Sequence, residues 1–242
     1  MFDYSQASIL VTGASRGLGL GLVQQLAAKR AGRVIAACRS DHGVAEVQAL
    51  QLPRVEAMLL DVCNPEHITR CAQSVSSLDL LINNAGTASA CGFLSEQALS
   101  IGRNEMDAHY FAPLQLTQAL LPTLQKSAQA GIINIASIAA ISNFKAMGTY
   151  SASKAALHFL TQGLRAELKG ANIFVQGVYP GPFDTRLAAG YDGPKKSPQA
   201  IAALVLEAFQ ANVAEVFPDD FSRTMHDMFL ASPKKLDEAF SQ

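Results

Sequence analysis

The chain has 242 residues, and its 49% hydrophobic and 16% charged content excludes a disordered chain. Nineteen basic residues against 20 acidic ones give a formal net charge of −1, which argues against nucleic acid or an anionic membrane as the main partner. The first residues lack a signal-peptide pattern, and no apolar stretch approaches the ~20 residues of a spanning helix. We therefore expect one cytoplasmic domain over residues 1–242.

The alternation of short β-branched runs with longer helical patterns predicts repeated βαβ units. In chain order, strands are expected over residues 8–12, 33–38, 54–60, 78–83, 131–137, 172–179 and 215–217. Helices are expected over residues 18–30, 44–52, 65–76, 100–121, 151–168 and 198–212. Because the strands are nearly continuous apolar runs, helices should cover both faces of the sheet. The prediction is an α/β fold with a doubly wound (Rossmann) parallel sheet of about seven strands. Residues 188–198 have loop composition, and a substrate loop is expected over about 186–198.

The cysteines and histidines show no spacing typical of a metal site. The cysteines are Cys38, Cys63, Cys71 and Cys91, and none forms a CxxC pair. Reduced, mostly buried thiols are expected rather than disulfides. Four of the five histidines, His42, His67, His158 and His226, show no ligand spacing either. We expect no metal.

A glycine-rich turn, Thr12-Gly-Ala-Ser-Arg-Gly-Leu-Gly19, lies between the first expected strand and the first helix. Glycines there allow a tight turn, let backbone N–H groups approach a pyrophosphate, and place that anion at a helix N-terminus. A turn that merely needs positive φ would also explain them, but their place between strand and helix favours a phosphate site. The residues expected to contact a dinucleotide here are Gly13, Ser15, Arg16, Gly17, Leu18 and Gly19.

The end of the second strand indicates which nicotinamide cofactor is bound. NAD sites usually carry an acidic residue there for the ribose hydroxyls, but this chain has Cys38 followed by Arg39. Arg16 lies in the glycine turn nearby, and guanidinium groups suit the additional phosphate of NADP. The alternative is that both arginines are simply solvated. We expect NADPH in preference to NAD.

Tyr150 and Lys154 are spaced to share one helical face, and Ser137 ends a predicted central strand. A lysine ammonium beside the phenol, with an oxidised nicotinamide above it, would lower the tyrosine pKa from ~10 toward neutrality. Such a tyrosine could protonate a carbonyl oxygen, and the serine hydroxyl could hydrogen-bond the same oxygen.

Together these motifs resemble the short-chain dehydrogenase/reductase family, in its short type, over nearly the whole chain. The matching residues are the TGxxxGxG turn, Asn83-Asn-Ala-Gly86, Tyr150-Ser-Ala-Ser-Lys154 with Ser137, and Pro180-Gly181 through Thr185. The resemblance implies that Tyr150 is the general acid/base, that Lys154 binds the nicotinamide ribose, and that Ser137 orients the carbonyl. Further cofactor contacts that it implies are Asp61, Val62, Asn83, Ala85, Gly86, Pro180, Gly181, Phe183 and Thr185. The sequence around Arg16 and Arg39 is similar to that of a carbonyl-reductase-like branch of the family.

His109 is a departure from that family pattern. Within Met106-Asp-Ala-His-Tyr-Phe-Ala-Pro113 it stands where the family usually has an asparagine that holds a water of a proton relay. Histidine could join the relay with an altered pH dependence, since its pKa lies near ~6.5. It could equally be a satisfied helix residue that the relay bypasses, or the mark of an impaired enzyme.

The function expected from these observations is NADPH-dependent reduction of an uncharged ketone, aldehyde or quinone-like compound to an alcohol, or the reverse reaction. Candidate walls of the substrate site are Phe93, Phe144, Phe183, Leu187 and Tyr191, which are mostly apolar, while Lys195 and Lys196 leave room for an acidic substrate. The leucine stripe Leu157, Leu160, Leu164 and Leu168 is either core or the helix-pairing surface through which the family commonly forms homodimers and homotetramers. The alternative function is a cofactor-binding sensor or scaffold that has lost efficient chemistry.

Overall fold

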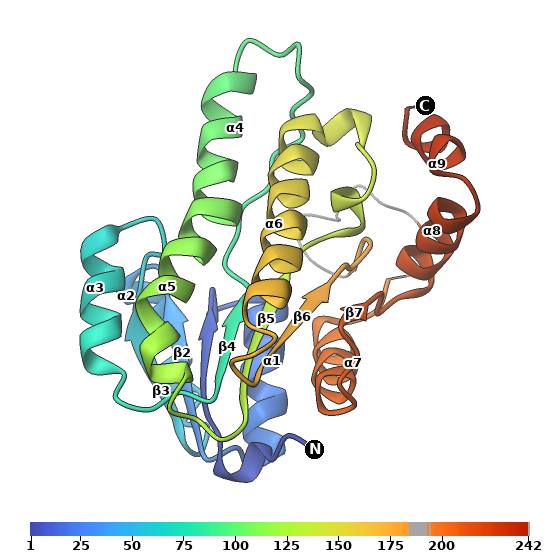
Figure 1. Cartoon of the computed structure of the whole chain (residues 1–242). Helices are drawn as coiled ribbons and strands as arrows, with labels where there is room; N and C mark the ends of the chain where they lie inside the picture. The colour runs from blue at the N-terminus through green and yellow to red at the C-terminus, as the bar shows by residue number, and fades with distance from the viewer. Residues whose placement is uncertain (184–192, 194, 242) are drawn as a thin grey trace.

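The computed structural model describes residues 1–183, 193 and 195–241, and its centre is a seven-stranded parallel sheet. The strands are β1 (Ser8–Thr12), β2 (Arg33–Cys38), β3 (Val55–Leu59), β4 (Leu80–Asn83), β5 (Ala130–Ile135), β6 (Ile173–Val178) and β7 (Glu215–Val216). Their order in the sheet is β3-β2-β1-β4-β5-β6-β7 (Figure 1). The strand order reverses between β1 and β4, and open sheets of this type bind ligands at the carboxyl ends of the strands beside such a reversal. The predicted fold class is confirmed.

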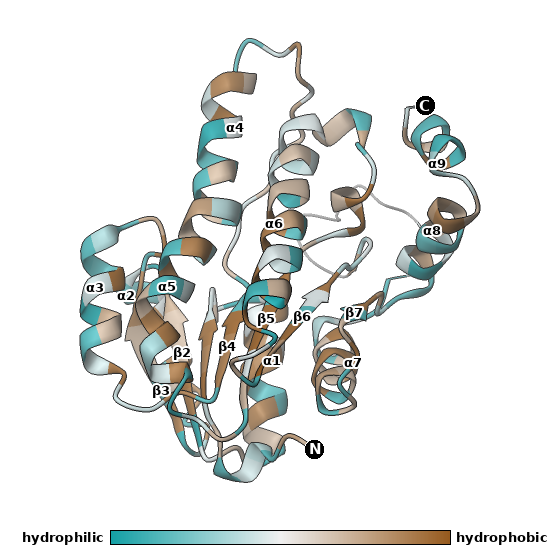
Figure 2. Cartoon of the chain, viewed as in Figure 1, coloured by the Kyte–Doolittle hydropathy of each residue, from teal (hydrophilic) through white to brown (hydrophobic). Residues whose placement is uncertain are grey.

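Helices cover both faces of the sheet. Around the sheet lie α1 (Gly17–Ala28), α2 (Asp41–Ala49), α3 (Pro65–Ser74), α5 (Ala112–Leu124), α6 (Gly148–Glu167) and α7 (Pro198–Gln210). One apolar cluster joins the sheet to α1, α2 and α7, and a second joins it to α3, α5 and α6. Colouring by hydropathy shows the strands as the apolar centre, with hydrophilic residues along the outer helices (Figure 2). The strand β3 is the exception, because it lies at the sheet edge and is only half buried.

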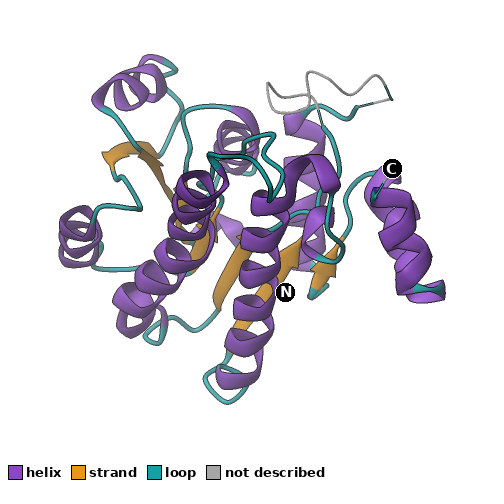
Figure 3. Ribbon diagram, turned by 90° about the horizontal axis from the view of Figure 1, so that it is seen from above, coloured by secondary structure: helices purple, strands orange, loops and turns teal. Residues whose placement is uncertain are grey.

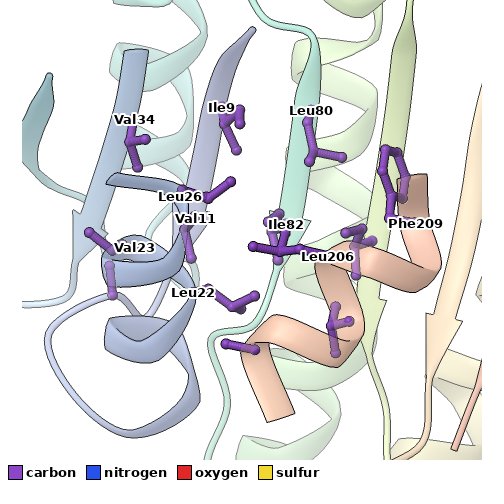
Figure 4. Packing of buried hydrophobic residues seen from close by; sticks show 14 of the residues in the cluster. Ile9, Val11, Leu22, Val23, Leu26, Val34, Leu80, Ile82, Leu206 and Phe209 are labelled. Atoms are coloured by element: carbon purple, nitrogen blue, oxygen red, sulfur yellow. The ribbon is translucent and has the colours of Figure 1, made fainter. Parts of the chain in front are cut away.

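The face covered by α1 and α7 is packed with aliphatic and aromatic side chains. Those labelled in Figure 4 come from β1, β2, β4, α1 and α7, and include Ile9, Val11, Leu22, Leu26, Leu80, Ile82, Leu206 and Phe209. Phe209 is almost completely buried and meets the ring of Phe2 edge-on, with 5.1 Å between the ring centroids.

The leucine stripe of α6 belongs to the core. Leu157 and Leu168 are buried, and Leu160 and Leu164 are partly buried against apolar clusters. The thiols also follow expectation, since all four cysteines are free and Cys63 alone of them is exposed. Within the described ranges, no helix has the length and apolar character needed to cross a membrane.

The helix predicted over residues 100–121 extends over residues 98–124 and is interrupted by a π-helical turn. It consists of α4 (Ala98–Met106), a π-helical turn η2 (Asp107–Phe111) and α5, which follow one another directly. Pro113 lies in the first turn of α5, where it has no N–H to donate and its ring excludes the carbonyl four residues earlier. A local widening of the helix relieves that conflict, and it falls on the turn that carries His109.

Two C-terminal helices were not predicted from the sequence. These are α8 (Asp220–Ala231) and α9 (Pro233–Phe240), which lie beyond β7 (Figures 1 and 3). Asp219 caps α8, and its other carboxylate oxygen accepts a hydrogen bond from the Gly181 N–H at 2.8 Å. The Ser142 hydroxyl donates to Asp237 of α9 at 2.6 Å. The C-terminal helices are thus fastened to two of the loops at the carboxyl edge of the sheet.

Candidate active site

The glycine turn has the geometry of a phosphate-binding turn. Gly13 and Gly17 have φ angles of +64° and +54°, in the region that favours glycine. A Cβ atom on Gly19 would lie 2.1 Å from the Gly13 carbonyl oxygen, so no other residue fits there. The helix α1 begins at Gly17, and its first N–H groups are those that bind anions in folds of this kind.

The segment after β4 is fastened to this turn by Asn84, a residue that the sequence analysis did not single out. Its side-chain nitrogen donates to the Thr12 carbonyl oxygen at 2.8 Å. The Thr12 hydroxyl oxygen in turn accepts the backbone N–H groups of Asn84 and Ala85, each at 2.9 Å. The glycine turn and the predicted cofactor-contacting segment 83–86 are therefore held together as one unit.

Asn83 has a different place in the structure. Its side chain donates to Asn134 of β5 at 2.8 Å, and Asn134 donates to the Thr161 hydroxyl of α6 at 2.9 Å. All three side chains are buried. This polar chain ties β4, β5 and α6 together beneath the predicted catalytic residues.

Ser137, Tyr150 and Lys154 come together beyond the carboxyl end of β5. Ser137 caps the short 3-10 helix η3 (Ile138–Ala140), while Tyr150 and Lys154 lie one turn apart on α6. The Ser137 side chain lies close enough to the Tyr150 phenol to lower its pKa. The Lys154 ammonium lies 5.7 Å from the centroid of the Tyr150 ring and donates to the Ile135 carbonyl oxygen at 2.8 Å.

Burial dominates the electrostatics of these groups. It raises the pKa of Tyr150 to about 12, against the lowering effect of the nearby Ser137 side chain. It lowers the pKa of Lys154 to about 7, against the raising effect of Glu105. The protein groups alone therefore do not give the expected shift of the tyrosine pKa toward neutrality, because desolvation of the phenolate is the largest effect.

His109 is buried, and both of its ring nitrogens have partners within the protein. Nε2 accepts the Thr87 backbone N–H at 3.1 Å, and Nδ1 lies 2.8 Å from the Ser153 hydroxyl. That hydroxyl donates to the Tyr150 carbonyl oxygen at 2.7 Å, so Nδ1 carries the proton and donates to Ser153. Burial and the nearby Lys154 charge hold the pKa of His109 well below its usual value. The ring is thus neutral and meets the Tyr150 ring edge-on.

The remaining predicted cofactor residues lie around the glycine turn and the neighbouring strand ends. Arg16 and Arg39 are both exposed, and Ser15 is half buried. Asp61 and Val62 follow β3, where the Asp61 carboxylate accepts the Cys63 N–H at 3.0 Å. On the other side, the Pro180 carbonyl oxygen lies 3.5 Å from the Ser137 hydroxyl, and Phe183 packs against the apolar cluster of α1 and α7.

The expected substrate walls are only partly within the described residues. Thr185, Leu187 and Tyr191 lie outside them, as does most of the expected substrate loop. Phe144 is partly exposed and packs edge-on against Phe240 of α9, with ring centroids 5.3 Å apart. Phe93 contacts Gly148 and lines an apolar groove of about 450 Å³ between α4 and α6.

The geometry agrees with what comparisons with known proteins find. The family described as short chain dehydrogenase matches residues 7–195. The ketoacyl reductase HetN of a Nostoc species is 31% identical over 86% of this chain and 77% of its own. An uncharacterized oxidoreductase of Staphylococcus saprophyticus is 32% identical over 89% of this chain and 98% of its own.

Solved structures are similar over almost the whole chain. A short chain dehydrogenase from Burkholderia cenocepacia, in complex with NADP, has a TM-score of 0.90 and 32% identity, covering 98% of both chains. The Pseudomonas aeruginosa RhlG/NADP complex has a TM-score of 0.80 and 29% identity, covering 91% of this chain and 98% of RhlG. The chain belongs to the short-chain dehydrogenase/reductase family and is an oxidoreductase of that family.

Proposed function

We propose that this protein interconverts a ketone or aldehyde and the corresponding alcohol, with NADPH as the preferred cofactor and Tyr150 as the general acid/base. The observation that carries this proposal is that Ser137, Tyr150 and Lys154 meet beyond the carboxyl end of β5, with Lys154 one helical turn after Tyr150. An uncharged substrate suits Phe144 and Phe183, two of the expected walls, because both are apolar.

The residues of the glycine turn fit a dinucleotide. Positive φ at two glycines and the absence of space for a Cβ at Gly19 leave the backbone open to a pyrophosphate. The exposed guanidinium groups of Arg16 and Arg39 are suited to the additional phosphate of NADP. NADP in the two structural relatives named above supports this choice of cofactor. When bound, the nicotinamide supplies or accepts the hydride.

The protein groups then handle the proton and the orientation of the substrate. With a pKa of about 12, the Tyr150 hydroxyl keeps its proton at neutral pH and can donate it to a carbonyl oxygen. The Ser137 hydroxyl stabilises the negative charge that develops on that oxygen. The Lys154 ammonium has N–H groups beyond the one given to Ile135, and these can bind the ribose hydroxyls.

We propose that His109 is a positioning residue and not a proton carrier. Both ring nitrogens are engaged, and through Ser153 the ring supports the backbone carbonyl of Tyr150. These contacts favour the interpretation that the proton relay bypasses His109 over the interpretation that His109 takes part in it. They also weaken the sensor or scaffold alternative, since the substitution leaves the three catalytic side chains together.

The proposal includes a single domain over residues 1–242, a cytoplasmic location and a homodimer or homotetramer. The apolar groove between α4 and α6, with the exposed Leu99 and Phe111 at its rim, supports pairing of two copies.

The test is the Tyr150→Phe variant, assayed on a panel of ketones, aldehydes and quinones with NADPH and with NADH. We expect turnover to fall by about 10²–10⁴-fold, while the affinity for NADPH stays within a few-fold. Tyr110→Phe removes the same hydroxyl from a half-buried tyrosine outside the site and should retain full turnover. Unchanged turnover in Tyr150→Phe would reject the assigned acid. Tight NADPH binding by the wild-type protein without oxidation of the cofactor by any compound would favour the sensor.

A further inference from the structure

Glu105 is a buried acidic side chain that the proposed mechanism does not yet use. It lies on α4, one helical turn before His109, and only 1% of its surface is exposed. One carboxylate oxygen, Oε1, accepts the Ser89 backbone N–H at 3.0 Å. The other oxygen, Oε2, is buried and has no hydrogen-bond partner among the described residues. A buried carboxylate oxygen without a partner is costly, so its position calls for an explanation.

The carboxylate is held in place by the loop that follows β4. Thr87 and Ser89, two residues apart in this loop, donate their backbone N–H groups to His109 and Glu105, four residues apart on the helix. The matched spacing places both acceptors on the same side of the helix, facing the loop. Glu105 therefore cannot turn toward solvent without breaking its bond to Ser89.

Lys154 is the buried group that needs such a carboxylate. Among the described residues, its hydrogen bond is to a neutral carbonyl oxygen, that of Ile135. A buried ammonium is unfavourable unless an opposite charge compensates it. The titratable groups that act on it are Glu105 from α4 and the neutral His109 from η2, and the phenol of Tyr150 faces it on its own helix. Glu105 is the acidic one of these, and α4 packs against α6.

We propose that Glu105 is a positioning residue of the active site, and that its buried carboxylate is the counter-charge that keeps Lys154 in its ammonium form. Within the described chain, no ion pair joins the two side chains directly. The remaining N–H groups of Lys154 are consequently left for a ligand, whereas a direct salt bridge would occupy one of them. The inference rests on the role proposed for Lys154, but its test does not require turnover.

The experiment measures the titration of Lys154 by NMR of ¹³Cε-labelled lysine in the cofactor-free protein. The Glu105→Gln variant keeps an oxygen acceptor for Ser89 and removes the charge. We expect the midpoint of Lys154 to fall by about one pH unit, so that about tenfold less of it is protonated well above the midpoint. Glu105→Asp keeps the charge and should retain most of the wild-type midpoint. Asp107→Asn removes an exposed acid two residues along and should leave the midpoint unchanged.

An unchanged midpoint in Glu105→Gln, or an equal shift in Glu105→Asp and Glu105→Gln, would overturn the proposal. If Glu105→Gln does not fold, the wild-type protein gives the answer through the ¹³Cδ signal of Glu105. That signal should change at the pH where Lys154 titrates, and a flat signal there would overturn the proposal as well. A protein with the expected titration but no turnover on any carbonyl would refute the proposed function and leave this inference standing.

Discussion

The two faces of the sheet differ in the side chains that they bury. The face covered by α1 and α7 is filled by apolar side chains such as Leu22, Ile82 and Phe209 (Figure 4). On the opposite face, near the carboxyl ends of β4 and β5, buried polar side chains gather, among them Asn134 and His109. Apolar burial stabilises a fold at any pH, whereas buried polar groups do so only while each keeps its partner and its charge state. The first face is therefore purely a source of stability, whereas the second combines its own apolar cluster with polar groups that hold the site in one geometry.

The largest expected effect is on the apolar face. Phe209→Ala removes a buried aromatic ring and should lower the free energy of unfolding by about 3–5 kcal/mol, because the cavity is not refilled. Urea unfolding at pH 7 measures it. Leu204→Ala, on the exposed side of the same helix, should change the stability by less than about 0.5 kcal/mol. Similar losses in the two variants would show that burial on this face is not what makes Phe209 stabilising.

In the polar chain of β4, β5 and α6, the losses of two hydrogen-bonded partners should not add. Asn134→Leu leaves the buried amide of Asn83 without its acceptor and should cost about 1–3 kcal/mol. The double variant Asn83→Leu/Asn134→Leu removes donor and acceptor together, so its loss should be smaller than the sum of the two single losses. A double-mutant cycle in urea tests this, and simple additivity would contradict the pairing.

Lowering the pH should reduce the stability of the folded protein through protonation of His109, on the polar face. Its pKa in the folded protein lies well below the unfolded value of about 6.5, so the unfolded chain takes up the proton first as the pH falls. The stability that the neutral ring contributes is therefore present above the unfolded pKa and is lost progressively as the pH falls below it. His109→Gln should remove that part of the acid sensitivity, as measured by urea unfolding above and below the unfolded pKa. His42→Gln, at an exposed histidine, should leave it intact.

The smallest expected effect concerns the contact between α9 and the loop that precedes α6. Ser142→Ala removes one hydrogen bond to Asp237 and should cost about 1 kcal/mol, localised to α9. Hydrogen exchange should become faster in α9 and remain unchanged in β4 and β5. Uniform acceleration throughout the chain would show that α9 does not open on its own.

The sequence predicted the elements whose residues carry a local signal. The ranges expected for β1 and β2 match the structure, because both are buried apolar runs bounded by turn residues. Tyr150 and Lys154 were identifiable because their spacing matches one helical turn. The π-helical turn at Asp107–Phe111 was not identifiable, since it arises from Pro113 within a pattern that otherwise continues as a helix.

Residues whose partners are backbone atoms of distant segments were the ones missed. Glu105 accepts an N–H from Ser89, and Asn84 donates to the Thr12 carbonyl, and backbone groups carry no sequence signal. The helices α8 and α9 were missed because much of their surface is polar and their anchors, such as Asp219 and Asp237, act on loops elsewhere in the chain.

The bond between Ser142 and Asp237 also has a consequence for how the protein is made. The two residues are separated by 95 positions, and the loop that Asp237 fastens lies between the proposed catalytic serine and tyrosine. On the ribosome, every one of the proposed catalytic side chains is synthesised well before this anchor. The loop between the reacting groups can therefore be tied down only after Asp237 has emerged, later than every strand of the sheet.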